Sequence, residues 1–385
     1  MSTLKKIFFL SLFIFFLSLL FWGIYVLSFK KTEPTKNTIL PLNNSNSNLT
    51  LPEKISPASS TQKISLVSKE PVISPTISSN GGNIRYYSTS GELKETDFSG
   101  STSKKITDKT IFGLISGVWS PDKSKILLKT KKGASPYFLL FDTKTNQLTM
   151  LNSNINEISW QTISSKIFYK YFDSNGKKSS LNVSDANGEN WKKIIDLPHE
   201  KISFAQIPRS GLVSFWNNGD ANYQTNLQTA SLIGEDIKTI YQSGFGADYL
   251  WDNSGNHCLV SQTDTKGGTK LQLGIINYNG EGYKILGLPT IVSKCTWSKD
   301  NATIYCALPG NIPENSILPN DYKTGKFTTV DTFWKINTDT GEKTRLVETS
   351  DISQDFDASE FFLNTDESLL FFVNKIDKKL YKIIL

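Results

Sequence analysis

The sequence predicts an all-β protein: a six-bladed β-propeller preceded by one N-terminal transmembrane helix and a disordered linker. Three observations predict this organisation. A hairpin unit recurs along most of the chain, an uncharged apolar run lies near the N-terminus, and a stretch without aromatic residues separates them. The expected boundaries are a cytoplasmic tail (1–6), a transmembrane signal anchor (7–29), a flexible Pro/Ser/Asn/Thr-rich linker (30–82) and the propeller (83–385).

The apolar run covers residues 7–29, 23 positions without a charge. As a helix it would be about 34 Å long, enough to cross the hydrocarbon core of a bilayer. It exceeds the usual apolar region of a signal peptide, and no small-residue cleavage site follows it, so an uncleaved anchor is expected. A short N-terminal tail is easily retained inside. We therefore expect a single-pass protein of the cell membrane with its propeller on the extracytoplasmic side.

The linker is predicted from composition. Residues 30–82 contain no aromatic side chain and six of the 14 prolines. Such a segment buries too little apolar surface to offset the entropy of ordering it. It is interpreted as a stalk that lifts the domain off the bilayer, or as a simple spacer.

The repeated unit is clearest in VWSPDKSKILL, residues 118–128, which reads as two apolar strands joined by a polar turn. Five further copies align without gaps. The six anchor positions are Trp119, Trp160, Ala205, Trp251, Trp297 and Leu363. Most copies are followed by a second strand–turn–strand element, so that each period holds four strands, as a propeller blade does. We expect the tryptophans to pack between blades.

The number of blades depends on residues 83–98, which precede the first complete unit. If this segment supplies the outer strand of the last blade, the ring closes without an open edge and has six blades. Because the segment could hold two strands, seven blades are the alternative.

WSPDKSKILL resembles the W-S-P-D-G-x-x-I-x-F hairpin of TolB-type, WD40-like (PD40) β-propeller repeats. NVSDANGENWKKI is similar to their turn between the third and fourth strands. The resemblance covers about residues 84–385 and implies a propeller fold. TolB itself has an extra N-terminal domain, whereas this chain has the predicted anchor.

Charge and motifs exclude several functions. Residues 1–82 carry a net charge of +5, and the remaining 303 carry 34 basic and 33 acidic groups. A nearly neutral domain lacks the basic surface that nucleic-acid binding requires. With two histidines and no G-x-S-x-G motif, the chain is expected to have no catalytic residues, no metal site and no cofactor. SDANGENW (184–191) approaches the S-x-D-x-G-x-T-W box of sialidase-like propellers and is interpreted as a turn-stabilising feature.

The spacing between the last two anchors is 66 residues, because residues 307–332 are inserted between the second and third strands of the fifth blade. Long loops on a rigid scaffold often carry binding residues, although a tolerated surface insertion is equally consistent. The candidate ligand- or partner-binding residues are Asn311, Glu314, Asn320, Asp321 and Tyr322, with Phe245 and His199 on neighbouring inter-blade loops.

Two cysteines form a candidate disulfide. If the hairpin turn centres on Asp300 and Asn301, Cys295 lies opposite Cys306, within bonding range. The alternative is a pair of buried thiols. Cys258 occupies a core position and is expected to be free.

The expected function is that of a membrane-anchored binding module that docks a protein or cell-envelope component without catalysis. The alternative is a glycan-acting hydrolase with carboxylates in the propeller funnel, and a third interpretation is a structural surface protein. The expected partners are the membrane, through residues 7–29, and a protein or envelope component, but no nucleic acid.

Overall fold

The computed structural model describes residues 63–133, 135–198 and 201–385, nearly all of one compact unit that begins at Thr61. The predicted cytoplasmic tail, the transmembrane segment and most of the predicted linker lie outside the described residues. Within the described ranges, no helix is long and apolar enough to cross a membrane.

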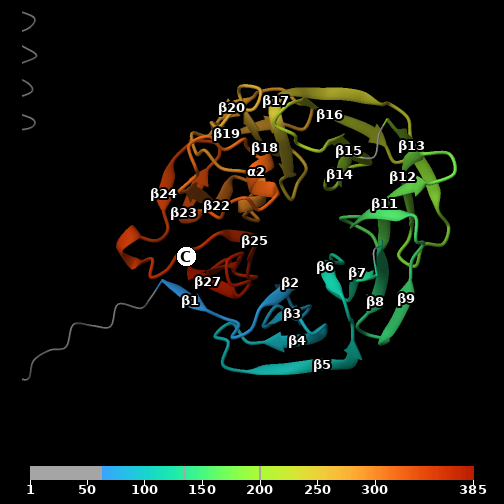
Figure 1. Ribbon diagram of the computed structural model, residues 1–385, viewed down its shortest axis with the longest axis horizontal. Coiled ribbons are helices and arrows are strands. Elements are labelled where there is room, and N and C mark those ends of the chain that lie inside the picture. Colours follow the sequence, from blue (N-terminus) through green and yellow to red (C-terminus); the bar gives the residue numbers. More distant parts are fainter. Residues whose placement is uncertain (1–62, 134, 199–200) are drawn as a thin grey trace, which may run out of the picture. The chain divides into compact units, whose positions relative to one another are not determined.

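Six antiparallel sheets are arranged around a common centre in this unit (Figure 1). The first three described here follow the chain, each with four strands in sequence order from the centre outward. They comprise β2 (Val72–Ile77), β3 (Ile84–Ser88), β4 (Glu92–Thr96) and β5 (Ser103–Thr110); β6 (Leu114–Trp119), β7 (Lys125–Lys132), β8 (Ser135–Asp142) and β9 (Gln147–Met150); and β10 (Ile155–Trp160), β11 (Lys166–Asp173), β12 (Lys178–Asp185) and β13 (Lys192–Leu197).

The fourth sheet has seven strands. They are β14 (Ile202–Gln206), β15 (Leu212–Asn217), β16 (Gln224–Ser231), β17 (Lys238–Trp251), β18 (His257–Thr263), β19 (Leu271–Asn277) and β20 (Lys284–Ile285). The long strand β17 pairs with β16 mainly through its first part and with β18 through its second part. Two four-stranded halves therefore share this strand.

The last two sheets each have four strands. One contains β21 (Cys295–Trp297), β22 (Thr303–Gly310), β23 (Val330–Asn337) and β24 (Lys343–Arg345); the other contains β25 (Ala358–Leu363), β26 (Leu369–Asn374), β27 (Leu380–Ile384) and, outermost, β1 (Ile64–Leu66). Three short helices complete the unit: η1 (Val292–Lys294), α2 (Asn320–Lys323) and η2 (Thr349–Asp351).

Strand β1 closes the ring, and this corrects the prediction that residues 83–98 would do so. β1 pairs with β27, next to the C-terminus (Figure 1). Residues 83–98 instead form β3 and β4 of a separate sheet. The alternative of seven blades required this segment to hold two strands, as it does.

The predicted linker boundary at residue 82 is also wrong, because β1 and β2 both precede it. Ile64 and Val72 are buried, so aliphatic side chains anchor this segment in the core although it contains no aromatic residue. Pro75 is accommodated where the pairing of β2 with β3 shifts register, between Ile73 and Thr76.

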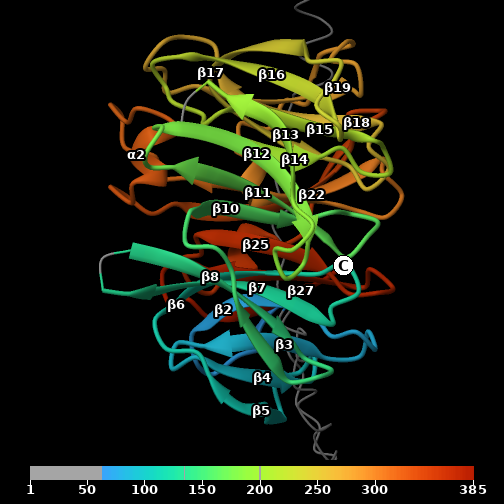
Figure 2. The ribbon, with the colours of Figure 1, turned by 90° about the vertical axis from the view of Figure 1, so that its right-hand side faces the viewer.

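The repeated tryptophans join neighbouring sheets, as the sequence predicts. The indole nitrogen of Trp119 donates to the carbonyl of Ser74 at 2.9 Å, and that of Trp160 donates to the carbonyl of Val118 at 2.7 Å. In both cases the acceptor lies on the innermost strand of the preceding sheet. The core is thus built from interfaces between successive sheets, and Figure 2 shows these sheets from the side of the ring.

Candidate functional site

The predicted binding loop, residues 307–332, packs against the ring and uses its polar side chains internally. The Asn320 side chain accepts from the amide of Ala221 at 2.9 Å and donates to Asp220 at 3.1 Å. Asp321 accepts from the amide of Ile317 at 2.9 Å and pairs with Lys326 at 2.6 Å. These two predicted contact residues therefore hold the loop in place.

Gly246 allows the insertion to approach the ring closely. It has a positive φ of 65°, and a Cβ there would lie 2.3 Å from Cδ of Pro319. No larger side chain fits between the two without movement. The insertion is consequently fixed against β17, and α2 lies on one face of the ring (Figure 2).

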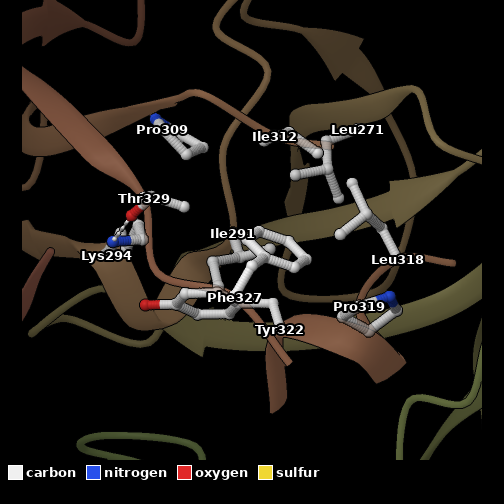
Figure 3. A pocket seen from close by; sticks show the side chains of 10 residues that line it. All are labelled: Leu271, Ile291, Lys294, Pro309, Ile312, Leu318, Pro319, Tyr322, Phe327 and Thr329. Carbon is white, nitrogen blue, oxygen red and sulfur yellow. Dashed lines mark hydrogen bonds between the residues drawn. The ribbon is translucent and has the colours of Figure 1, made fainter. Parts of the chain in front are cut away.

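Tyr322 is buried, and its hydroxyl donates to Asp357 at 2.6 Å. The hollow beside it has a volume of about 10 Å³ and a mostly apolar lining that includes Ile291 and Leu318 (Figure 3). That volume holds about one water molecule, which excludes it as a site for an organic ligand.

The other predicted contact residues are not gathered at this place. Asn311 and Glu314 are exposed and Phe245 is half-buried, whereas His199 lies outside the described residues. The structure therefore does not assemble the seven predicted residues into one site.

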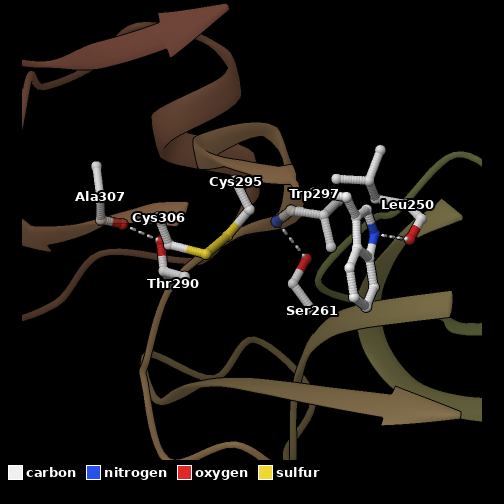
Figure 4. The surroundings of a disulfide bond; sticks show 8 residues. Leu250, Ser261, Thr290, Cys295, Trp297, Cys306 and Ala307 are labelled. Carbon is white, nitrogen blue, oxygen red and sulfur yellow. Dashed lines mark hydrogen bonds between the residues drawn. A yellow bond between two sulfur atoms is a disulfide. The ribbon is translucent and has the colours of Figure 1, made fainter. Parts of the chain in front are cut away.

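The cysteine prediction is confirmed in its disulfide form. Cys295 and Cys306 are bonded and directly opposed on β21 and β22 (Figure 4). Cys258 is free and buried, as expected. The bond joins two strands of one sheet beside Trp297, whose indole donates to the carbonyl of Leu250 at 3.2 Å and so connects this sheet with the preceding one.

A hollow of about 560 Å³ lies on the β10–β13 sheet, beside the 151–154 connection between this sheet and the preceding one. We call it the inter-sheet groove. This volume falls within the range of sites for small organic ligands, about 300–1,000 Å³. Its lining residues are Asn152, Ile155, Tyr169, Tyr171, Asp173, Lys178, Ser180, Asn182, Asn187, Gly188, Glu189, Trp191, Lys193 and Asp196.

Strand register places the groove side chains on one face of the sheet. Tyr169 is paired with Asn182, and Tyr171 with Ser180, so that two aromatic rings lie beside an amide and a hydroxyl. Residues two apart on a strand point to the same side, which makes this a continuous strip. Lys193 extends it because its partner across the next pair of strands is Asn182.

The aromatic groups of the groove differ in how firmly they are held. Tyr169 is 5% exposed, and burial raises the pKa of its hydroxyl. The hydroxyl of Tyr171 accepts from the side chain of Asn154 at 3.0 Å. Trp191 is 63% exposed, an unusual exposure for the largest apolar side chain. The groove therefore offers two positioned rings and one open ring.

Charged groups of both signs line the groove. Lys193 pairs with Asp196 at 3.0 Å, and the Asp173 side chain accepts from the amide of Asn175 at 3.0 Å. Lys178, at the start of β12, is exposed. This mixture favours ligands rich in hydroxyl groups over strongly charged ones.

This groove is not predicted from the sequence. The one signal was SDANGENW, which contains Gly188 and Trp191, but the box was interpreted only as a turn. The tyrosine pair on β11 looks like ordinary core in the sequence. Only the register of three strands shows that polar groups flank it.

A hydrolase would need two carboxylates facing the centre of the propeller, so the acidic residues of the innermost strands are the candidates. They are Glu157 on β10, Asp248 on β17 and Glu360 on β25. Glu157 pairs with Lys170 at 3.1 Å, and Asp248 accepts from the indole of Trp216 at 3.1 Å. In the described part of the chain, no hydrogen bond or ion pair links any of these three acids to another.

No cluster of three or more His, Cys, Asp or Glu side chains suited to a metal ion occurs among residues 63–133, 135–198 and 201–385. No protein-family model matches the chain, and no curated protein matches its sequence.

Solved structures do resemble it. An oligogalacturonate lyase in complex with manganese has a TM-score of 0.62 at 12% identity, and one from Vibrio parahaemolyticus has 0.63 at 10%; each match covers 85% of this chain and 94% of the other. The β-propeller domain of the trilobed protease from Pyrococcus furiosus, described as having an open velcro topology, has a TM-score of 0.53 at 13% identity, with 81% and 95% covered.

These similarities establish the fold: residues 63–385 form a β-propeller domain, as the TolB-type repeats implied. At such low identity they carry no activity over to this chain. The pairing of β1 with β27 shows that this ring is closed by a strand from the N-terminal side.

Proposed function

We propose that the protein is a membrane-anchored, extracytoplasmic propeller that binds an envelope oligosaccharide in the inter-sheet groove without chemical change. We also infer that the propeller has seven blades, with β17 serving two of them. The groove supports the binding role because it combines volume, aromatic rings and neutral hydrogen-bonding groups on one rigid sheet.

A saccharide fits this lining for chemical reasons. Sugar rings present apolar C–H faces that stack on aromatic side chains, and hydroxyl groups that both donate and accept hydrogen bonds. Trp191 and Tyr171 supply rings, and the Ser180 hydroxyl, which accepts from the buried Asn182 side chain at 3.0 Å, supplies a donor for a sugar oxygen. A protein partner would ordinarily need a wider surface, about 800 Å² on each side, instead of a hollow of this size.

Binding can be measured by titrating the detergent-solubilised full chain against a panel of defined envelope oligosaccharides. Trp191→Ala should weaken binding of any recognised member at least about tenfold, because it removes an exposed aromatic contact. Tyr278→Ala is the matched control, since Tyr278 is a 60% exposed aromatic residue in the corresponding turn of another sheet. Equal affinities for the two variants would contradict the groove as the site.

The alternative, a glycan-acting enzyme, can be tested on the same panel by following new reducing ends or unsaturated products. The engagement of Glu157 by Lys170 and of Asp248 by Trp216 favours binding over hydrolysis, because each carboxylate already has a partner in the fold. Turnover of a bound oligosaccharide would replace the binding proposal with the catalytic one.

The proposed location predicts the oxidation state of the cysteines in cells. Disulfides persist outside the cytoplasm and are rare within it. After rapid quenching and denaturation, we expect one alkylated thiol, that of Cys258, and three after reduction. Three free thiols before reduction would contradict export.

A further inference from the structure

A buried ionic cluster lies at the end of the 307–332 insertion, away from the inter-sheet groove. Lys294 is 1% exposed, and its Nζ lies 2.6 Å from Oδ2 of Asp331 and 2.8 Å from Oδ1 of Asp357. Both carboxyl groups are fully buried. The side chain of Lys294 also donates to Thr329 at 3.0 Å, as Figure 3 shows.

The cluster is electrostatically expensive in its ionised form. It places one ammonium and two carboxyl groups in the interior, where each charge loses its hydration. Oδ1 of Asp331 is buried and has no hydrogen-bond partner. The other oxygen, Oδ2, accepts from Lys294 and from the amide of Ala358. An unsatisfied oxygen costs more on a carboxylate than on a neutral carbonyl.

The two carboxyl groups differ chemically. Burial raises the pKa of Asp331, so its carboxylate takes up a proton more readily than an exposed one and becomes electrophilic once it does. Burial acts in the same direction on Asp357, but Lys294 and the Tyr322 hydroxyl outweigh it and hold the pKa of Asp357 below its usual value. Asp357 is therefore ionised, and its Oδ1, 2.8 Å from Nζ of Lys294, is in position to relay a proton.

We propose that Lys294 and Asp331 condense into an intramolecular amide bond. Asp357 takes a proton from the Lys294 ammonium, and the freed Nζ lone pair attacks Cγ of Asp331. The Nζ–Cγ bond forms and the Cγ–Oδ2 bond breaks. Oδ2 leaves as water, having received the proton shuttled by Asp357 and a second proton from Nζ. One ammonium and one carboxylate thus become one amide and one water, with no oxidant or co-reactant.

The surroundings fit this reaction at each step. Nζ and the carboxyl group are already in hydrogen-bond contact, so little motion is needed to reach bonding distance. The product removes two buried charges and leaves Oδ1 of Asp331 as an amide carbonyl. Asp357 keeps Tyr322 as a donor and Lys375 as a counter-charge at 3.9 Å.

The adjacent hollow of about 10 Å³, lined in part by Lys294 and Thr329, matches one water molecule in size and could receive the leaving group (Figure 3). Lys294 and Asp331 are 1% and 0% exposed, so bulk water has little access to the bond. The cross-link would join η1 to β23, one residue from the Cys295–Cys306 disulfide.

Mass spectrometry of the full chain tests the proposal. After denaturation, reduction and alkylation, the wild-type protein should be lighter than its sequence by about 18 Da, the mass of one water. Trypsin should not cleave after Lys294 and should release residues 285–299 joined to residues 327–335. The full sequence mass together with cleavage after Lys294 would overturn the proposal, and this wild-type result is decisive without any variant.

Variants test the assigned roles. Asp357→Asn removes the proton acceptor at nearly constant volume and should restore the full mass. Asp339→Asn is the matched control, because it makes the same change at an exposed aspartate outside the cluster, and it should retain the loss of water. A cross-link that survives in Asp357→Asn would contradict the role of Asp357.

Discussion

At the residue scale, the repeated S-P-D-type turns are stabilised by their aspartates. Asp122 accepts from the hydroxyls of Ser120 and Ser124 at 2.7 and 2.6 Å and from the amide of Ser124 at 3.1 Å. Asp300 occupies the same place in its hairpin and accepts from the amides of Ala302 and Thr303. The motif is thus a structural signature, and its aspartates are committed to the turn.

This bonding makes stability depend on pH. Hydrogen bonds from Ser124 and Ser120 lower the pKa of Asp122 to about 2. Because the folded-state pKa lies below the unfolded value of about 4, the carboxylate stabilises the fold above pH 4, and that contribution is lost as pH falls to about 2.

We expect Asp122→Ala to reduce the free energy of unfolding at pH 7 by about 0.5–1 kcal/mol, a small effect because the side chain is largely exposed. Urea unfolding at several pH values should show the difference from wild type shrinking between pH 5 and pH 2. Asp108→Ala, at an exposed aspartate of β5, is the control and should show neither effect. A pH-independent difference would contradict the carboxylate's role.

At the scale of elements, the sequence predicts pairing within hairpins but not pairing between strands that are far apart in the chain. The alternation around Asp300 predicts the pairing of Cys295 with Cys306 because a tight turn fixes register locally. By contrast, β1 has three residues and pairs with β27 across almost the whole folded chain, so no local pattern indicates it. The absence of aromatic residues misled the linker prediction because aliphatic side chains alone bury this segment.

The candidate site, too, depends on contacts between distant parts of the chain that the sequence does not reveal. The 66-residue spacing located the insertion between the second and third strands, although residues 307–310 and 330–332 extend those strands and the loop itself is 311–329. The sequence could not show that Asn320 and Asp321 bond within the protein. Whether a polar side chain is free for a ligand depends on tertiary packing. The inter-sheet groove was missed for a related reason: its polar strip depends on the register of β11, β12 and β13 together.

At the scale of the whole molecule, one short strand determines whether the ring is closed. Ile64 on β1 is paired with Ile383 on β27 and is buried in the core shared by the last two sheets. Beyond the strand, the amide of Val67 donates to the carbonyl of Leu380 at 2.9 Å. These contacts bring the N-terminal side of the domain to its C-terminal strand. A pull on the predicted linker would therefore act directly on the pairing of β1 with β27.

We therefore expect Ile64→Ala to lower the free energy of unfolding by about 2–4 kcal/mol, through the cavity it leaves and the weakened closure. Leu66→Ala is the matched control, because Leu66 lies on the same strand but is 41% exposed, and it should cost well under 1 kcal/mol. Denaturant unfolding of the full chain measures both values, and limited proteolysis reports release of β27. If the two variants lose equal stability, or if β27 stays protected in Ile64→Ala, β1 is not the element that holds the ring closed. A large difference with early cleavage at β27 would show that the three-residue strand transmits its effect to the entire propeller.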